Sequence, residues 1–131
     1  MNDFENAIAK MDFEFFGTGQ HKIDVESFLH QKNAVLLDVR APEEYNTLKL
    51  NLSHFCQVLE IPTHKVPSRI NEIPKDKMIG VFCSSGVRCV IIFAYLKSKG
   101  FENVKILPGG YNNLTEAIKP GKIFKKINGY K

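Results

Sequence analysis

The sequence predicts an α/β domain in which a mostly parallel central sheet of about five strands carries helices on both faces. Short, wholly apolar runs at residues 34–39 and 78–82 are typical of strands that are covered on both sides. Segments with apolar residues at helical spacing separate these runs, so strand and helix alternate along the chain. The 131 residues fit one domain, and a hydrophobic content of 44% suits a buried core.

Each element is justified by its local pattern. Strands are expected where apolar runs are short, at residues 34–39, 55–61, 78–82 and 104–107. Helices are expected where apolar residues recur every three or four positions, at residues 3–16, 24–29, 64–73, 86–99 and 111–119. A further short helix begins at Pro42, with Glu43 and Glu44 in its first turn, where carboxylates suit the helix dipole.

The chain divides into three parts. Residues 1–20 form a helical extension, 21–120 the main domain, and 121–131 a lysine-rich tail that we expect to be loosely held. The extension has three possible roles that the sequence leaves open: packing on the sheet edge, covering the site, or mediating dimerisation. A monomer and a homodimer are equally compatible with the sequence.

Composition narrows the functional classes. A net charge of +4 suits small anionic ligands, and no nucleic-acid-binding motif accompanies it, so no nucleic acid partner is expected. No apolar run is long enough to span a bilayer, so no membrane partner is expected. The three cysteines lack disulfide or zinc spacing, which favours free thiols in a reducing, cytoplasmic location and no metal.

The most informative segment is Cys83-Ser84-Ser85-Gly86-Val87-Arg88, between an apolar strand and an expected helix. A helix start carries partial positive charge and unpaired N–H groups, both of which favour a thiolate over a thiol. The loop amides would then cradle a small anion, which the arginine can anchor. The pattern therefore predicts nucleophilic sulfur chemistry at Cys83, against the alternative of an inert, buried cysteine.

Four segments resemble the rhodanese-like sulfurtransferase family in its single-domain form, and the resemblance covers residues 23–119, which are most of the chain. They are Leu-Leu-Asp-Val-Arg at 36–40, the run from Ser53 to Pro62 that contains His54, the loop at 82–88, and Leu-Pro-Gly-Gly at 107–110.

The chain departs from the family pattern in several places. Ser53 and Gln57 replace the glycines that flank the family's histidine, Cys56 stands where proline is usual, and Cys89 replaces the serine that commonly follows the loop arginine. The tryptophan that usually follows the last signature is absent, and the segment at 46–52 is longer than usual.

The resemblance implies a persulfide mechanism without a cofactor. Cys83 would take the sulfane sulfur from a small anionic donor such as thiosulfate and pass it to cyanide, a thiol or a protein acceptor. The resemblance also implies that the loop residues bind the donor and that two residues of the first signature support the site. The binding residues are Ser84, Ser85, Gly86, Val87 and Arg88, and the supporting residues are Asp38 and Arg40.

Two other functions remain open. One is a cysteine phosphatase or arsenate reductase, whose loop has five residues between the cysteine and the arginine. Here only four residues separate Cys83 from Arg88, and the shorter loop makes a tighter anion-binding site. A persulfide relay module would instead exchange sulfur with a protein partner through an exposed thiol of low pKa.

The other two cysteines also have alternative interpretations. Cys89 is either a small core residue or a resolving thiol for an oxidised Cys83, and the latter needs the two Cα atoms within about 7 Å. Cys56 is most simply a buried residue. His54 is either a half-buried histidine with a hydrogen-bond partner or part of the site.

Overall fold

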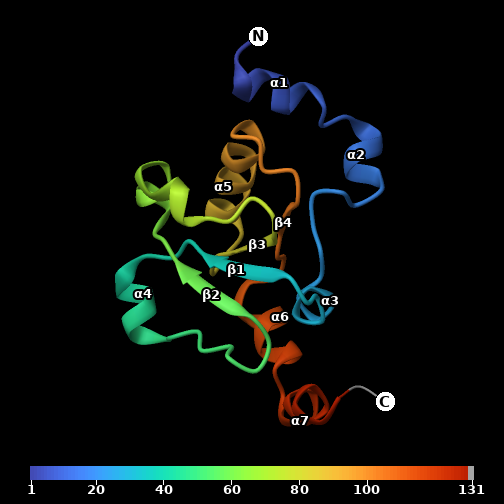
Figure 1. Ribbon diagram of the computed structural model, residues 1–131, viewed down its shortest axis with the longest axis vertical. Helices are drawn as coiled ribbons and strands as arrows, with labels where there is room; N and C mark the ends of the chain where they lie inside the picture. The colour runs from blue at the N-terminus through green and yellow to red at the C-terminus, as the bar shows by residue number, and fades with distance from the viewer. Residues whose placement is uncertain (130–131) are drawn as a thin grey trace.

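The computed structural model describes residues 1–129. Its centre is a four-stranded parallel sheet in the order β2-β1-β3-β4 (Figure 1). The strands are β1 (Ala34–Asp38), β2 (Gln57–Glu60), β3 (Met78–Phe82) and β4 (Val104–Ile106). About five strands were expected, and the described residues form four. In place of a fifth strand, Lys22 makes a single parallel bridge to Ile106 beside β4. The predicted α/β fold is confirmed.

The strand order determines where a site can lie. β2 pairs with one edge of β1 and β3 with the other, so the direction of winding reverses between β1 and β3. Open parallel sheets bind ligands beyond the carboxyl ends of strands at such a reversal. The last residues of the two strands, Asp38 and Phe82, are partners in register. The segments that follow them, beginning at Val39 and Cys83, therefore emerge side by side.

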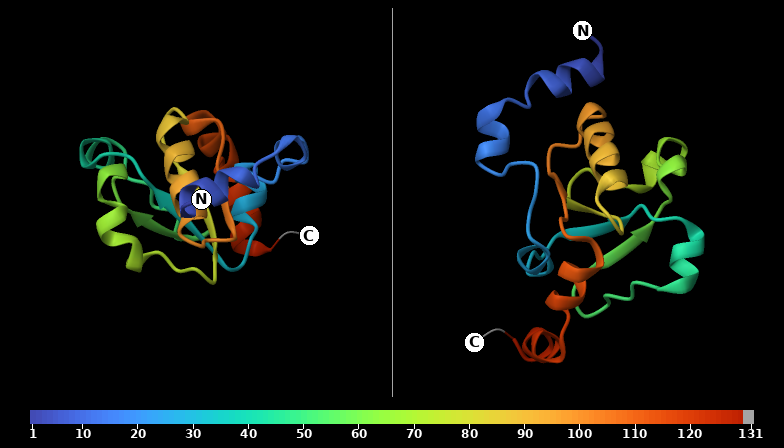
Figure 2. Two further views of the ribbon diagram at one scale, coloured as in Figure 1. Left: turned by 90° about the horizontal axis from the view of Figure 1, so that it is seen from above. Right: turned by 180° about the vertical axis from the view of Figure 1, so that it is seen from behind.

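Helices cover both faces of the sheet (Figure 2). α5 (Val87–Ser98) covers one face, and α3 (Val25–Leu29) and α6 (Gly110–Ala117) cover the other. Two further helices, α4 (Pro42–Thr47) and α7 (Pro120–Asn128), contribute no residue to either core. Successive side chains of β1 point to opposite faces, as pleating requires. Val35 and Leu37 join a core with α5, whereas Ala34 and Leu36 join a second core with α3 and α6.

The N-terminal extension forms two helices, α1 (Asp3–Ala9) and α2 (Phe13–Gly17), instead of the single helix expected over 3–16. Asp12 causes the break, because its carboxylate accepts the N–H of Phe15 at 2.9 Å and begins a new helix. α1 packs against α5 at the end of that helix which carries Tyr95 and Ser98 (Figure 1). The extension therefore lies by the last turns of α5 and does not cover the start of that helix.

Two other expectations were wrong. Residues 64–73 form the 3-10 helices η1 (Thr63–Lys65) and η2 (Pro67–Glu72), because a proline inside the segment interrupts a regular α-helix. The tail, expected to be loose, forms α7, where Lys122 pairs with Glu26 of α3. Residues 130–131 of that tail lie outside the described part. Within residues 1–129, no helix has both the length and the apolar character needed to cross a membrane.

Candidate active site

Cys83 follows β3 directly and lies at the base of the loop that leads into α5. Its side chain is 1% exposed, and its sulfur accepts the N–H of Gly86 at 3.0 Å and that of Cys89 at 3.4 Å. Gly86 has a φ of 101°, in the left-handed region that glycine favours, and it caps the start of α5. The turn thereby directs backbone N–H groups at the sulfur, as the sequence pattern predicts.

These donors favour the thiolate. The pKa of Cys83 is lowered to about 5, first by a hydrogen bond from the Cys89 side chain, against the opposing effect of burial. The backbone N–H groups of Cys89, Gly86 and Ser85 lower it further. Conversely, the pKa of Cys89 is raised, first because its thiol proton is held by Cys83 and then because it is buried. Cys83 is therefore the member of the pair that carries charge at neutral pH.

The two other cysteines lie in different surroundings. Cys89 is 1% exposed, and its thiol also lies 3.1 Å from the Gly86 carbonyl oxygen. It is thus both a buried core residue and a neighbour of Cys83. Cys56 lies with the core on the opposite face of the sheet, where burial raises its pKa to about 11.

Arg88 is held in place by α4. Its guanidinium makes a bidentate ion pair with Glu44, at 2.5 Å and 3.0 Å, and donates to the Ser84 hydroxyl at 2.8 Å. The pKa of Glu44 is lowered to about 2, first by the hydrogen bond from Arg88. From the sequence, Glu44 is only a first-turn carboxylate, so this partner was missed. Only the expected position of α4 near the strand ends could have indicated it.

Asp38 and Arg40 form a fully buried ion pair at 2.7 Å. Arg40 also donates to the Tyr111 hydroxyl at 3.0 Å and to the main-chain carbonyls of Glu44 and Leu48 at 3.4 Å and 2.9 Å. These contacts tie β1 to α4 and α6, the two helices that flank the loop. Tyr111, at the position where the family usually has tryptophan, was not predicted to have this role.

The glycine pair before α6 packs directly on the loop. A Cβ atom at Gly110 would lie 2.1 Å from the carbonyl oxygen of Ser84, and the φ of Gly110 is 53°. Only a residue without a side chain fits at such a distance. The sequence explains the pair as a tight turn, but the contact with the loop became visible only in the structure.

The remaining loop residues form the rim. Ser85 is exposed, and the Val87 side chain is 67% exposed at the start of α5. His54 lies exposed in the turn before β2, which does not match the half-buried position considered from the sequence. Among residues 1–129, no three His, Cys, Asp or Glu side chains gather in a way that could hold a metal ion.

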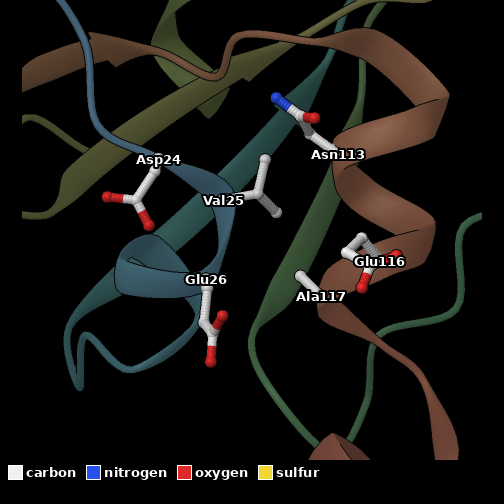
Figure 3. A pocket seen from close by; sticks show the side chains of 6 residues that line it. All are labelled: Asp24, Val25, Glu26, Asn113, Glu116 and Ala117. Carbon is white, nitrogen blue, oxygen red and sulfur yellow. The ribbon is translucent and has the colours of Figure 1, made fainter.

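A separate shallow pocket lies between α3 and α6 and is lined by Asp24, Val25, Glu26, Asn113, Glu116 and Ala117 (Figure 3). Its carboxylates have structural partners. Asp24 caps α3 by accepting the N–H of Ser27 at 3.0 Å, Glu26 pairs with Lys122, and Glu116 pairs with Lys119 at 2.8 Å. Because these carboxylates already have partners, the Cys83 loop and not this pocket is the candidate active site.

Fold and site together define a class: an α/β domain with a thiolate-stabilising loop at the winding reversal of a parallel sheet. Residues 23–117 match the rhodanese-like domain family. The chain belongs to this rhodanese-like family, as its motifs indicated.

Relatives of several kinds share the domain. A sulfurtransferase from Allochromatium vinosum is 33% identical over 94 residues, which cover 69% of this chain and 83% of that protein. A tRNA uridine(34) hydroxylase from Legionella pneumophila (strain Lens) is 30% identical over 92% of this chain, and the chain spans about half (53%) of its length. The structure of a NAD-dependent persulfide reductase from A. fulgidus matches with a TM-score of 0.58 and 37% identity, over 74% of this chain and 16% of that one.

Proposed function

We propose that this protein transfers a sulfane sulfur from a small anionic donor, such as thiosulfate, to a thiol or cyanide through a persulfide on Cys83. The observation that carries the proposal is the buried Cys83 sulfur with backbone N–H donors at 3.0 Å and 3.4 Å. A buried sulfur with inward-pointing donors suits an anionic nucleophile that is shielded from water. A reducing, cytoplasmic location would suit such a free thiol.

The reaction takes two displacements. In the first, the Cys83 thiolate attacks the outer sulfur of thiosulfate, a new S–S bond forms, the donor's S–S bond breaks, and sulfite leaves with the bonding electrons. In the second, a thiolate or cyanide attacks the terminal sulfur of the persulfide, and the Cys83 thiolate is regenerated. The cysteine itself carries the sulfur, so the proposal requires no cofactor.

The loop residues have distinct proposed roles. The amides of residues 84–88 stabilise the terminal sulfur anion of the persulfide. Arg88 uses three contacts on Glu44 and Ser84, so bracing the loop is its first role. A guanidinium has five N–H donors, and the remaining ones can orient the oxyanion of the donor. Asp38 and Arg40 support the loop through α4 and α6.

The loop length favours sulfur over phosphate chemistry. Only four residues separate Cys83 from Arg88, and the carboxylate of Glu44 already occupies one edge of the guanidinium. Phosphatase and arsenate reductase activities would need room for a tetrahedral oxyanion at that position. Turnover of an aryl phosphate at a rate above that of sulfur transfer would reverse this choice.

A relay module is the second candidate. A relative that matches 92% of this chain is named for tRNA modification, and the chain spans only about half of that relative. Val87, Val90 and Ile91 share one face at the start of α5 and are each at least 53% exposed. Such an apolar cluster beside the loop suits contact with a macromolecular partner. In this case Cys83 would receive sulfur from a persulfidated protein and not from free thiosulfate.

The test compares wild type, Cys83→Ser and Cys56→Ser in thiosulfate:cyanide transfer, with the intact mass measured after thiosulfate alone. Wild type and Cys56→Ser should turn over and gain one sulfur atom, whereas Cys83→Ser should do neither. If wild type gains sulfur only from a persulfidated protein donor, the relay module is correct. If no donor adds sulfur to Cys83, the sulfurtransferase proposal fails.

A further inference from the structure

The mechanism above leaves one buried nucleophile unused, which is Cys89 in the first turn of α5. Its backbone N–H lies 3.4 Å from the Cys83 sulfur. Because an N–Cα bond is about 1.46 Å long, the Cα atom of Cys89 lies at most about 4.9 Å from that sulfur. Both sulfur atoms also contact Gly86, whose N–H donates to the Cys83 sulfur at 3.0 Å and whose carbonyl oxygen lies 3.1 Å from the Cys89 sulfur. The two side chains are therefore close enough to be linked with a small rotation.

We propose that Cys89 is a resolving thiol, which forms an intrachain disulfide with Cys83 after hydrogen peroxide has oxidised Cys83. This requires only a reactive Cys83 thiolate, so it does not depend on which sulfur donor the protein uses. The disulfide would block the nucleophile reversibly and keep it from further, irreversible oxidation.

The chemistry balances in two steps. The Cys83 thiolate attacks one oxygen of peroxide, an S–O bond forms, the O–O bond breaks, and hydroxide leaves, so that Cys83 becomes a sulfenic acid. The Cys89 sulfur then attacks the Cys83 sulfur, an S–S bond forms and the S–O bond breaks. The departing hydroxide takes the Cys89 proton and leaves as water. The hydroxide from the first step takes up a solvent proton, which replaces the one that Cys83 lost on ionising. Overall, two thiols are oxidised and one peroxide is reduced to two waters.

The arrangement explains why Cys89 would react only after oxidation. The neighbouring Cys83 thiolate holds the Cys89 proton and raises the pKa of Cys89. A sulfenic acid is neutral, so this effect disappears when Cys83 is oxidised, and Cys89 ionises more readily. A persulfide on Cys83 would keep its negative charge beside Cys89. The resolving thiol would therefore stay protonated during sulfur transfer.

The third cysteine provides an internal control. Cys56 belongs to the core on the opposite face of the sheet, and its pKa is raised to about 11. Cys56 is therefore too far from Cys83 and too little ionised to form the disulfide in place of Cys89. Oxidation of the native protein should therefore give one specific pairing and not a mixture.

The experiment treats the reduced full chain with a molar excess of hydrogen peroxide, because each step from thiol to sulfenic acid to sulfinic acid consumes one peroxide. Free thiols are then blocked with N-ethylmaleimide, and the peptides are mapped by mass spectrometry. Wild type and Cys56→Ser should both give a Cys83–Cys89 linked peptide, and dithiothreitol should restore free thiols. In Cys89→Ser, which keeps a hydroxyl donor beside Cys83, Cys83 should instead progress to the sulfinic acid, which dithiothreitol does not reverse.

Two outcomes would overturn the proposal. One is a wild-type protein in which Cys83 reaches the sulfinic acid while Cys89 carries the maleimide. The other is a linked peptide that contains Cys56. Because the mapping reads bonds and not sulfur transfer, it gives an answer even if thiosulfate proves not to be a donor. The wild-type result is also informative if Cys89→Ser fails to fold.

Discussion

Cys83 and Cys56 differ in a way that burial alone does not explain. Cys83 is the less exposed to solvent, at 1% exposure, yet its pKa is lowered to about 5. Cys56 is only partly buried, and its pKa is raised to about 11 by desolvation. Burial acts against the thiolate in both, so the difference arises from the donors that each sulfur meets.

The comparison shows that the loop donors, and not the solvent exposure of the side chain, set the pKa of the thiol. Cys83 follows a strand at the winding reversal and meets the N–H groups at the start of α5. Cys56 lies before β2, beside the chain that leads from α4. The loop in turn depends on the Arg88–Glu44 ion pair and on the fit of Gly110 against Ser84. Each support can be removed separately.

The largest expected effect is in the pH dependence of alkylation. Between pH 8 and pH 6 the rate of Cys83 modification by iodoacetamide should stay nearly constant, because the thiol is ionised throughout and titrates only near pH 5. The rate at Cys56 should fall about a hundredfold, since its thiolate fraction drops about tenfold per pH unit far below its pKa of about 11. Quantitative peptide mass spectrometry at each pH measures both rates in one sample.

At any single pH, the difference between the alkylation rates of Cys83 and Cys56 should be smaller than their difference in ionisation. A thiolate of low pKa is intrinsically less nucleophilic, with a Brønsted slope of about 0.4–0.5, which offsets much of the difference in ionisation. The pH profile is therefore the better measurement. If the two cysteines show parallel profiles, the proposed donors do not act on Cys83 in solution.

The next largest effect concerns stability. Asp38→Asn removes the carboxylate that pairs with the fully buried Arg40 and should cost about 3–5 kcal/mol, since it leaves a buried charge uncompensated. Urea denaturation measures the loss. Glu72→Gln is the control because it removes an exposed ion pair with Arg69 and should leave the urea midpoint almost unchanged. Equal behaviour of the two variants would contradict a structural role for Asp38.

Much of the fold could be predicted from the sequence, because an uninterrupted run of apolar residues indicates a strand that is buried on both faces. The run at 34–39 predicted β1, and the run at 78–82 predicted β3 with its bounds. Local competition was harder to foresee. The capping carboxylate of Asp12 divides the N-terminal helix in two, and Pro67 turns an apparent amphipathic helix into 3-10 turns.

In the candidate site, too, local patterns could be predicted and distant contacts could not. Cys83 and the turn at Gly86 could be predicted, because they form one continuous segment between a strand and a helix. Glu44, Tyr111 and the close approach of Gly110 could not, because they meet the site through tertiary contacts over long sequence separations. A local sequence pattern indicates the element in which a residue lies, but it does not indicate which residues from distant segments contact it.

A smaller effect is expected at Gly110. Gly110→Ala would place a Cβ atom 2.1 Å from the Ser84 carbonyl oxygen, so the loop must move, and the φ of 53° adds strain. We expect a loss of about 1–3 kcal/mol in stability and a drop in the ratio of Cys83 to Cys56 alkylation at pH 6. Gly121→Ala is the matched control, since a Cβ atom there meets nothing within 4 Å. An unchanged ratio in Gly110→Ala would show that the glycine does not position the loop.

The smallest effect tests the ion pair at the edge of the loop. The folded pKa of Glu44 is about 2, below its ordinary value near 4.5, so its contribution to stability is present above pH 4.5 and is lost as the pH falls toward 2. Glu44→Gln should cost about 1–2 kcal/mol at pH 7, after allowance for a carboxylate that is partly exposed to solvent. In urea titrations the gap between wild type and variant should narrow as the pH falls from 5 to about 3. A gap that stays constant with pH would mean that Glu44 acts through packing and not through its charge on Arg88. The Cys83 donors would then be maintained by the backbone alone.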